Sequence, residues 1–366
     1  MKFNIAVLAG DGIGTEICDE TIKVLNALGK KYGHTFTFKH GLVGGAAIDA
    51  TNGASALPQE SIDICKASDA VLFGATGGPK WDNPLAKVRP EDGILGIRKA
   101  LGLFANIRPV KLYPELLDAS NLKPEVIRGS DFIFIRELTG GLYFGKPKKQ
   151  WSNKQGRVAV DTERYSEKEI TRVLKVGFEL ARSRNKKLTS VDKANVMACS
   201  RLWRQIAIEM SKDYPDVTLE HQLVDSCAMR LIQKPTSFDV AVTSNIFGDI
   251  LTDEASMVAG SMGMMPSASL AGTPVEGKRA MGLYEPIHGS APDIAGQNKA
   301  NPIATIVSAA FMLRYSLGLS KEAKIIENAV DRVIKEGYRT GDIKRKDDGK
   351  KLVGCTEMGD LIAERI

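Results

Sequence analysis

The sequence lacks the features that define several classes of protein. No apolar run approaches the roughly 20 residues that a transmembrane helix needs, and the apolar run at 5–9 is too short for the core of a signal peptide. The five cysteines are odd in number and show no C-x-x-C spacing, which argues against a disulfide framework or structural zinc and for a reducing compartment. We therefore expect a soluble, cytoplasmic protein with no membrane partner.

A large excess of one charge is also missing. The chain carries 50 basic and 44 acidic residues, a net charge of +6 over 366 residues. A nucleic-acid-binding surface would concentrate that excess, but the densest basic stretch, 344–351, is interrupted by two aspartates. We expect no nucleic-acid partner, and the mild positive balance suits a small acidic substrate held by a few arginines.

Repeats and low-complexity linkers are absent, and the length favours two domains or one large α/β unit. Short apolar segments of strand character alternate with helical patterns, which predicts an α/β fold with an at least partly parallel sheet. The expected strands are 3–8, 35–40, 70–74, 132–136, 187–192, 217–221 and 239–243, and the expected helices are 166–183, 201–210 and 245–260.

The last hundred residues are mostly helical in pattern. One helix is expected to start at Pro302, a second spans about 321–335, and a third follows Thr356 as its N-cap. The segment 143–160 differs, because it is polar and rich in Lys and Gly between strand-like residues. It predicts an extended hairpin or arm, with a mobile surface loop as the alternative.

A glycine-rich turn near the N-terminus resembles a dinucleotide-binding fingerprint but does not satisfy it. Gly10-x-Gly12-x-Gly14 follows a strand and precedes a helix, yet the sixth position is Thr15 and the next expected strand, 35–40, ends in basic residues. The standard Rossmann interpretation therefore fails. The glycines instead predict a tight turn whose backbone is closely approached by another group, with a cofactor as one candidate.

A pair of aspartates is the first candidate for a metal site. Asp249 and Asp253 are four residues apart on an expected helix, so their carboxylates share one face and repel unless a cation lies between them. Oxygen ligands favour Mg²⁺ or Mn²⁺. A solvated acidic face near a helix N-terminus is the alternative. Asp225, set among apolar residues at another expected strand-to-helix transition, favours the metal.

Three arginines stand in apolar surroundings. Arg98, Arg108 and Arg136 each follow an isoleucine, and a buried guanidinium must be paired. Its forked geometry suits a carboxylate, so the set predicts a ligand with two carboxylates. Structural salt bridges are an equally good explanation for any single one of them.

Further candidates are less specific. Lys193 follows an expected strand end and could act as a base near a cation, and Tyr143 could act as an acid. His288 lies in a long polar stretch, 284–296, that is typical of a binding loop. There it could stack on an adenine, and Asp293 could bind ribose hydroxyls and favour NAD over NADP. Packing or surface roles remain open for all four.

Together these segments closely resemble the isocitrate/isopropylmalate family of β-decarboxylating dehydrogenases over essentially the whole chain. The most specific blocks are RELTGGLYFG at 136–145, SNIFGDILTDE at 244–254 and EPIHGSAPDIAG at 285–296. The resemblance implies two domains that share one large twisted mixed sheet, which is not a Rossmann fold. It implies an NAD-binding domain of 1–103 with 260–366, and a dimerisation and metal/substrate domain of 104–259 with an arm near 143–160.

The resemblance also implies a role for each site residue. Arg98, Arg108 and Arg136 match the substrate-carboxylate arginines, Asp225, Asp249 and Asp253 the ligands of Mg²⁺ or Mn²⁺, and Tyr143 and Lys193 the acid–base pair. The implied NAD contacts are Gly78, Glu91, Glu285, His288, Gly289, Ser290, Ala291, Pro292, Asp293, Ile294 and Asn301. In a homodimer with shared sites, Lys193 and Asp225 would serve the partner's site.

Substrate choice in this family depends on the stretch before Arg98. Ile94 and Leu95, with Val196, are expected to line an apolar pocket beside Glu91, and 91–98 contains no serine or threonine to hold a third carboxylate. The expected reaction is the NAD-dependent oxidative decarboxylation of (2R,3S)-3-isopropylmalate to 2-oxoisocaproate and CO2, in leucine biosynthesis. Alternatives are a relative acting on tartrate, D-malate, 3-methylmalate or homoisocitrate, or a non-catalytic regulatory member.

Overall fold

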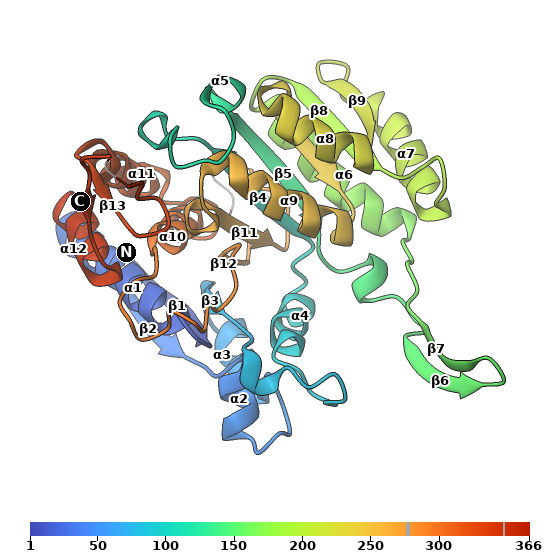
Figure 1. The fold of residues 1–366 in the computed structure, drawn as a ribbon, viewed down its shortest axis with the longest axis horizontal. Helices are drawn as coiled ribbons and strands as arrows, with labels where there is room; N and C mark the ends of the chain where they lie inside the picture. Colours follow the sequence, from blue (N-terminus) through green and yellow to red (C-terminus); the bar gives the residue numbers. More distant parts are fainter. Residues whose placement is uncertain (276–278, 347) are drawn as a thin grey trace.

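The structure is a computed structural model that describes residues 1–275, 279–346 and 348–366. Its centre is one sheet of ten strands (Figure 1). In order across the sheet the strands are β2 (Thr35–His40), β1 (Lys2–Gly10), β3 (Ala70–Ala75), β12 (Gly282–Pro286), β11 (Pro266–Leu270), β4 (Ala105–Lys111), β5 (Asp131–Glu137), β10 (Val240–Thr243), β8 (Lys187–Asp192) and β9 (Thr218–Leu223).

The sheet is mixed rather than parallel throughout. β11 runs antiparallel to both of its neighbours, β12 and β4, and β4 runs antiparallel to β5. The strands on either side of this central group pair in parallel. The predicted α/β class with one large mixed sheet is therefore confirmed.

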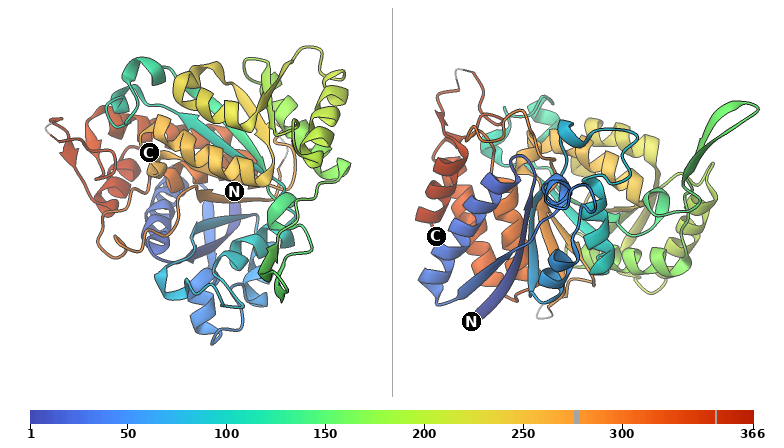
Figure 2. Two further views of the ribbon diagram at one scale, coloured as in Figure 1. Left: turned by 45° about the vertical axis from the view of Figure 1, so that its right-hand side comes forward. Right: turned by 90° about the horizontal axis from the view of Figure 1, so that it is seen from below.

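Two groups of helices cover the two halves of the sheet (Figures 1 and 2). Around β1, β3, β11 and β12 pack α1 (Gly14–Tyr32), α10 (Ile303–Tyr315), α11 (Ser320–Lys335) and α12 (Cys355–Glu364). Around the other half pack α6 (Glu167–Arg182), α7 (Ala198–Ser211), α8 (Val224–Gln233) and α9 (Asn245–Ala259). Among the described residues, no helix has both the length and the apolar character needed to cross a membrane.

Local chemistry explains where the helices begin. Ser166 and Glu169 form a reciprocal capping box before α6, so its predicted start is confirmed. α10 begins directly after Pro302, also as predicted. The prediction that Thr356 is an N-cap is wrong, because α12 begins at Cys355 and Gly354 occupies the cap position. Asn298 caps this helix instead: its carbonyl accepts from the Cys355 N–H (3.0 Å) and its Oδ1 from the Thr356 N–H (2.8 Å).

Several elements were not predicted from the sequence. They are β4, β11 and β12 and the helices α2 (Gly44–Ala50), α3 (Gln59–Lys66) and α4 (Glu91–Ala100). β4 and β11 each contain proline and buried polar residues, so they lack the apolar alternation of an ordinary strand. α4 carries two glycines, which weaken its helical pattern.

The predicted arm is a two-stranded antiparallel hairpin that extends away from the body (Figures 1 and 2). Its strands are β6 (Lys149–Asn153) and β7 (Gly156–Val160), and most of their residues are exposed. Trp151, near the middle of β6, is 41% exposed. An isolated hairpin of this length is marginally stable in water, so further contacts would stabilise it.

Candidate active site

A cavity of about 410 Å³ lies between the two groups of elements. Its wall comes from the end of β3 and the following loop, from α4, β4, β5 and α9, and from the loop after β12. The lining residues are Phe73, Gly74, Ala75, Thr76, Glu91, Ile94, Leu95, Arg98, Arg108, Arg136, Tyr143, Lys148, Asp249, Glu285, Pro286, Ile287, His288 and Gly289. A polar cavity at strand ends is the usual place for a small-molecule site in an α/β protein.

The three arginines of the sequence prediction all line this cavity, and all are buried. Arg98, on α4, donates from Nη2 to Glu285 Oε1 at 2.7 Å. Arg136, on β5, donates from Nε and Nη2 to Asn245 Oδ1 at 3.0 and 2.8 Å. Burial lowers the pKa of Arg136 and of Arg108, and each is further lowered by a neighbouring arginine. A ligand with two carboxylates would relieve this repulsion between like charges.

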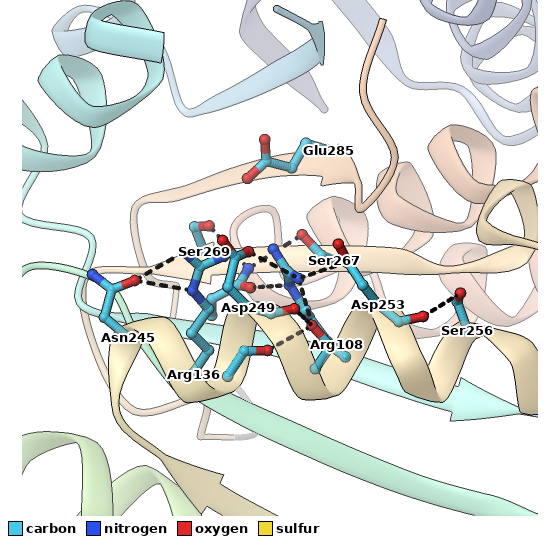
Figure 3. A network of polar contacts seen from close by, with 12 residues as sticks. Arg108, Arg136, Asn245, Asp249, Asp253, Ser256, Ser267, Ser269 and Glu285 are labelled. Atoms are coloured by element: carbon cyan, nitrogen blue, oxygen red, sulfur yellow. Dashed lines mark hydrogen bonds and ion pairs between the residues drawn. The ribbon is translucent and has the colours of Figure 1, made fainter. Parts of the chain in front are cut away.

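Asp249 lies beside Arg108 and Arg136 (Figure 3), and it also contacts Tyr143. It pairs with Arg136 Nη1 and accepts a hydrogen bond from the Tyr143 hydroxyl at 2.8 Å. Burial alone would raise the pKa of Asp249, but Arg136 and Arg108 outweigh it and lower the pKa. Burial raises the pKa of Asp253, one helical turn along α9. Arg108 Nη1 lies 3.8 Å from each of the two carboxylates.

Tyr143 is in its neutral form near neutral pH. Burial and the adjacent Asp249 carboxylate raise its pKa to about 12. Its hydroxyl therefore carries a proton at the cavity wall, and the Arg136 guanidinium lies 5.7 Å from its ring centroid.

The structure does not bring Lys193, Val196 or Asp225 to this cavity. Lys193 follows β8 and its Nζ donates to Asp225 Oδ1, near the start of α8, at 2.6 Å. Val196 is 65% exposed. Within the described ranges, no group of three or more His, Cys, Asp or Glu residues is arranged to hold a metal ion. Of the three predicted aspartates, Asp249 lines the cavity, and Asp253 lies one helical turn further along α9, within 3.8 Å of Arg108 Nη1. Their carboxylate oxygens suit Mg²⁺ or Mn²⁺.

The predicted cofactor loop divides into two parts. Glu285, His288 and Gly289 line the cavity, and Ser290 Oγ donates to the Gly77 carbonyl at 2.8 Å, which holds the loop against the turn after β3. Asn301 lies outside the cavity lining, where its Oδ1 accepts from the Ile303 N–H and its Nδ2 donates to Asp342.

The glycine-rich turn supports this loop. Gly12 has a φ of +55°, and a Cβ there would lie 2.0 Å from the Ser290 carbonyl oxygen. The backbone that approaches Gly12 closely is therefore that of Ser290. Asp11, which the sequence analysis passed over, accepts from the N–H groups of Gly45, Ala46 and Gly77.

Sequence reasoning also missed two residues on α9. Asn245 binds Arg136, and Thr252 accepts from Arg108 Nη1 at 2.5 Å. Both lie on the helix face that carries Asp249, at spacings of four and three residues. The same periodicity that pointed to Asp249 and Asp253 was the signal that could have found them.

Three buried arginines line this cavity opposite a helix that carries a carboxylate, and the cavity continues into the loop after β12, an arrangement that suits a small acidic ligand. A model of the isocitrate/isopropylmalate dehydrogenase family matches residues 4–362. The chain belongs to this family.

Named relatives and solved structures agree with this membership. The chain is 61% identical to a 3-isopropylmalate dehydrogenase of Dehalococcoides mccartyi over the full length of both, and 58% identical to one of Carboxydothermus hydrogenoformans, covering 100% of this chain and 95% of that protein. The fold is similar to that of an isocitrate dehydrogenase from Methylococcus capsulatus, with a TM-score of 0.84, 31% identity and 99% coverage of both chains. It is also similar to a β-decarboxylating dehydrogenase from Thermococcus kodakarensis, with a TM-score of 0.76, 32% identity and coverage of 99% and 96%.

Proposed function

We propose that this enzyme oxidises and decarboxylates (2R,3S)-3-isopropylmalate with NAD⁺, giving 2-oxoisocaproate and CO2 in leucine biosynthesis. The observation that carries the proposal is the pairing, in one cavity, of three buried arginines with an apolar wall from α4. Full-length identities of 61% and 58% to proteins named 3-isopropylmalate dehydrogenase support it.

The cavity suits two carboxylates and one apolar branch. Arg98, Arg108 and Arg136 offer charged donors, while Ile94 and Leu95 line the cavity one helical turn before Arg98. No hydroxyl side chain occurs in 91–98, so a third carboxylate would lack a partner there. A buried polar group left unpaired discriminates strongly, and an isopropyl group is therefore favoured over a carboxymethyl-type substituent.

The aspartates are the proposed metal-binding residues. Asp249 and Asp253 of one chain, with Asp225 of a second chain, would hold Mg²⁺ or Mn²⁺. Such an ion, when bound, orients the 2-hydroxy acid and stabilises negative charge on its oxygen. NAD would lie against the loop after β12, with Glu285, His288, Gly289 and 290–294 beside it and Gly78 and Glu91 opposite.

A homodimer is part of the proposal, because the acid–base pair is divided in the single chain. Lys193 and Asp225 pair with each other outside the cavity. The adjacent helices α8 and α9 expose Met229, Ile232 and Ile250 at 58%, 49% and 62%. Exposed apolar side chains on two packed helices are typical of a subunit interface. Through this interface the Lys193 side chain of one subunit would reach the cavity of the other.

In the proposed mechanism, Lys193 of one subunit and Tyr143 of the other carry out the proton transfers. Lys193 receives the C2 hydroxyl proton as hydride leaves C2 for NAD⁺. The C3 carboxylate then leaves as CO2, and its bonding electrons form an enolate. Tyr143, held in its protonated form beside Asp249, donates its proton to C3. The arginines keep the second carboxylate fixed during these steps.

A substrate panel tests the proposed function. We expect metal-dependent NAD reduction with 3-isopropylmalate, followed by absorbance and abolished by a chelator, with much slower reduction for D-malate, tartrate, 3-methylmalate, homoisocitrate and isocitrate. Turnover of isocitrate equal to or faster than that of 3-isopropylmalate would refute the substrate assignment. Circular dichroism of the chelator-treated sample checks that activity is lost without unfolding.

A further inference from the structure

Arg108 is held by a buried asparagine that the proposed mechanism does not use. Asn106 and Arg108 are two residues apart on β4, so their side chains leave the same face of the sheet. Asn106 is fully buried, and its Oδ1 accepts from Arg108 Nε at 2.6 Å. The contact is at the low end of the range for such bonds.

Two serines on the neighbouring strand fix the orientation of this amide. The guanidinium can only donate, so the amide oxygen must face it and the Nδ2 group must point the other way. Nδ2 donates to Ser267 Oγ at 3.2 Å and to Ser269 Oγ at 3.1 Å. Asn106 and Ser269 are direct partners in the β4–β11 register. Ser267 lies two residues from Ser269 on the same face of β11 (Figure 3).

Two hydrogen bonds fix the plane of the Arg108 guanidinium. Asn106 holds Nε, and Thr252 holds Nη1 from the opposite side, at 2.5 Å. These bonds leave the Nη2 protons to a ligand. Arg108 Nη1 already lies 3.8 Å from Asp249 and from Asp253. A guanidinium released from Asn106 could turn further toward these carboxylates and replace the two long ion pairs with direct hydrogen bonds.

We propose that Asn106 is a positioning residue for the substrate, and that Ser267 and Ser269 act through it. The serines lock the amide so that its oxygen fixes the plane of the Arg108 guanidinium and leaves Nη2 for a substrate carboxylate. This inference rests on the proposed function. It also explains why a buried strand pair carries an asparagine and two serines, since polar groups in a core are costly unless each is hydrogen-bonded.

The test compares three changes by steady-state kinetics. N106L removes both the amide oxygen and the amide nitrogen. N106D has nearly the same shape, but its negative charge offsets the positive charge of Arg108. The Ser267 and Ser269 hydroxyls can donate to the second oxygen of this carboxylate. We expect each Asn106 variant to raise the KM for 3-isopropylmalate about tenfold or more, with the KM for NAD⁺ within about twofold of wild type. The S267A/S269A double variant should give a smaller rise in the same KM, because the amide can then turn.

A matched control separates positioning from folding. S130A removes another buried serine hydroxyl, which donates to the Ile127 carbonyl at 2.6 Å outside the cavity lining. It should lower the thermal midpoint slightly and leave both KM values unchanged. N106D should unfold within a few degrees of wild type. A purely structural role for Asn106 would instead lower the midpoint and change both KM values together.

The failure of this inference is distinct from the failure of the proposed function. If wild type reduces NAD⁺ with 3-isopropylmalate and folded N106D and N106L keep the wild-type KM for it, the positioning role is overturned. If wild type does not turn over this substrate, the proposed function fails. The positioning role is then decided by 3-isopropylmalate-induced thermal stabilisation, which must be strong in wild type and S130A and weak in N106D and N106L; equal stabilisation in all four overturns it.

Discussion

At the scale of single residues, the site depends on buried charge that is matched by partners distant in the sequence. Arg98 and Glu285 are 187 residues apart in the chain, and Arg108 and Thr252 are 144 apart. An arginine among isoleucines predicts burial, because such a neighbourhood packs into a core. The partner of each arginine could not be predicted, because the strand order of the sheet, and not local sequence spacing, brings the two residues together.

Two histidines give the protein a predictable response to acid. Burial lowers the pKa of His221 and of His288. The unfolded chain takes up these protons near pH 6.5, where the folded chain does not, so acid favours the unfolded state between about pH 6.5 and the lower folded values. The free energy of unfolding, measured with urea, should therefore fall as the pH is lowered from 7.5 to 5.5.

Substitution of these histidines should reduce that pH dependence. The H221N/H288N double variant is expected to show a shallower fall in unfolding free energy than wild type over the same range. His40 is exposed, so H40N serves as the control and should leave the slope unchanged. An unchanged slope in the double variant would show that these two rings do not carry the effect.

At the scale of elements, α6 offers the clearest local test. Ser166 and Glu169 cap its N-terminus reciprocally. S166A removes one half of that box and should destabilise the protein by about 1 kcal/mol, measured by urea unfolding. K168A changes an exposed residue of the same turn and should alter stability by less than about 0.5 kcal/mol. Equal effects from the two changes would argue against the cap.

The elements differ in how far the sequence could predict them. α9 and its two aspartates followed from helical spacing, and β8 was predicted to its end residues. β11 and β4 could not be found in this way, because their polar residues are satisfied by each other across the strand pair, as Asn106 and Ser269 are. α4, which carries Arg98 and the apolar wall, is stabilised by packing that overrides its two glycines.

At the scale of the whole molecule, the proposed dimer predicts the effect of a charge on α8. I232D places a carboxylate on a 49% exposed apolar position of the proposed interface. We expect it to convert the dimer to a folded monomer, measured by light scattering after size exclusion, with activity lost by more than about a hundredfold because the shared site is broken. L352D places the same charge at another exposed apolar position, outside the proposed interface on α8 and α9, and should leave both the mass and the activity unchanged. An active I232D monomer would contradict shared sites.

Subunit complementation tests the central claim most directly. Y143F and K193A should each be nearly inactive, since each loses half of the proposed acid–base pair. If Tyr143 of one subunit works with Lys193 of the other, a mixed dimer of the two variants has one intact site and one doubly impaired site. Random exchange of equal amounts should then restore about a quarter of wild-type turnover of 3-isopropylmalate. No recovery in a sample whose mixed dimers are shown by mass spectrometry would contradict the account.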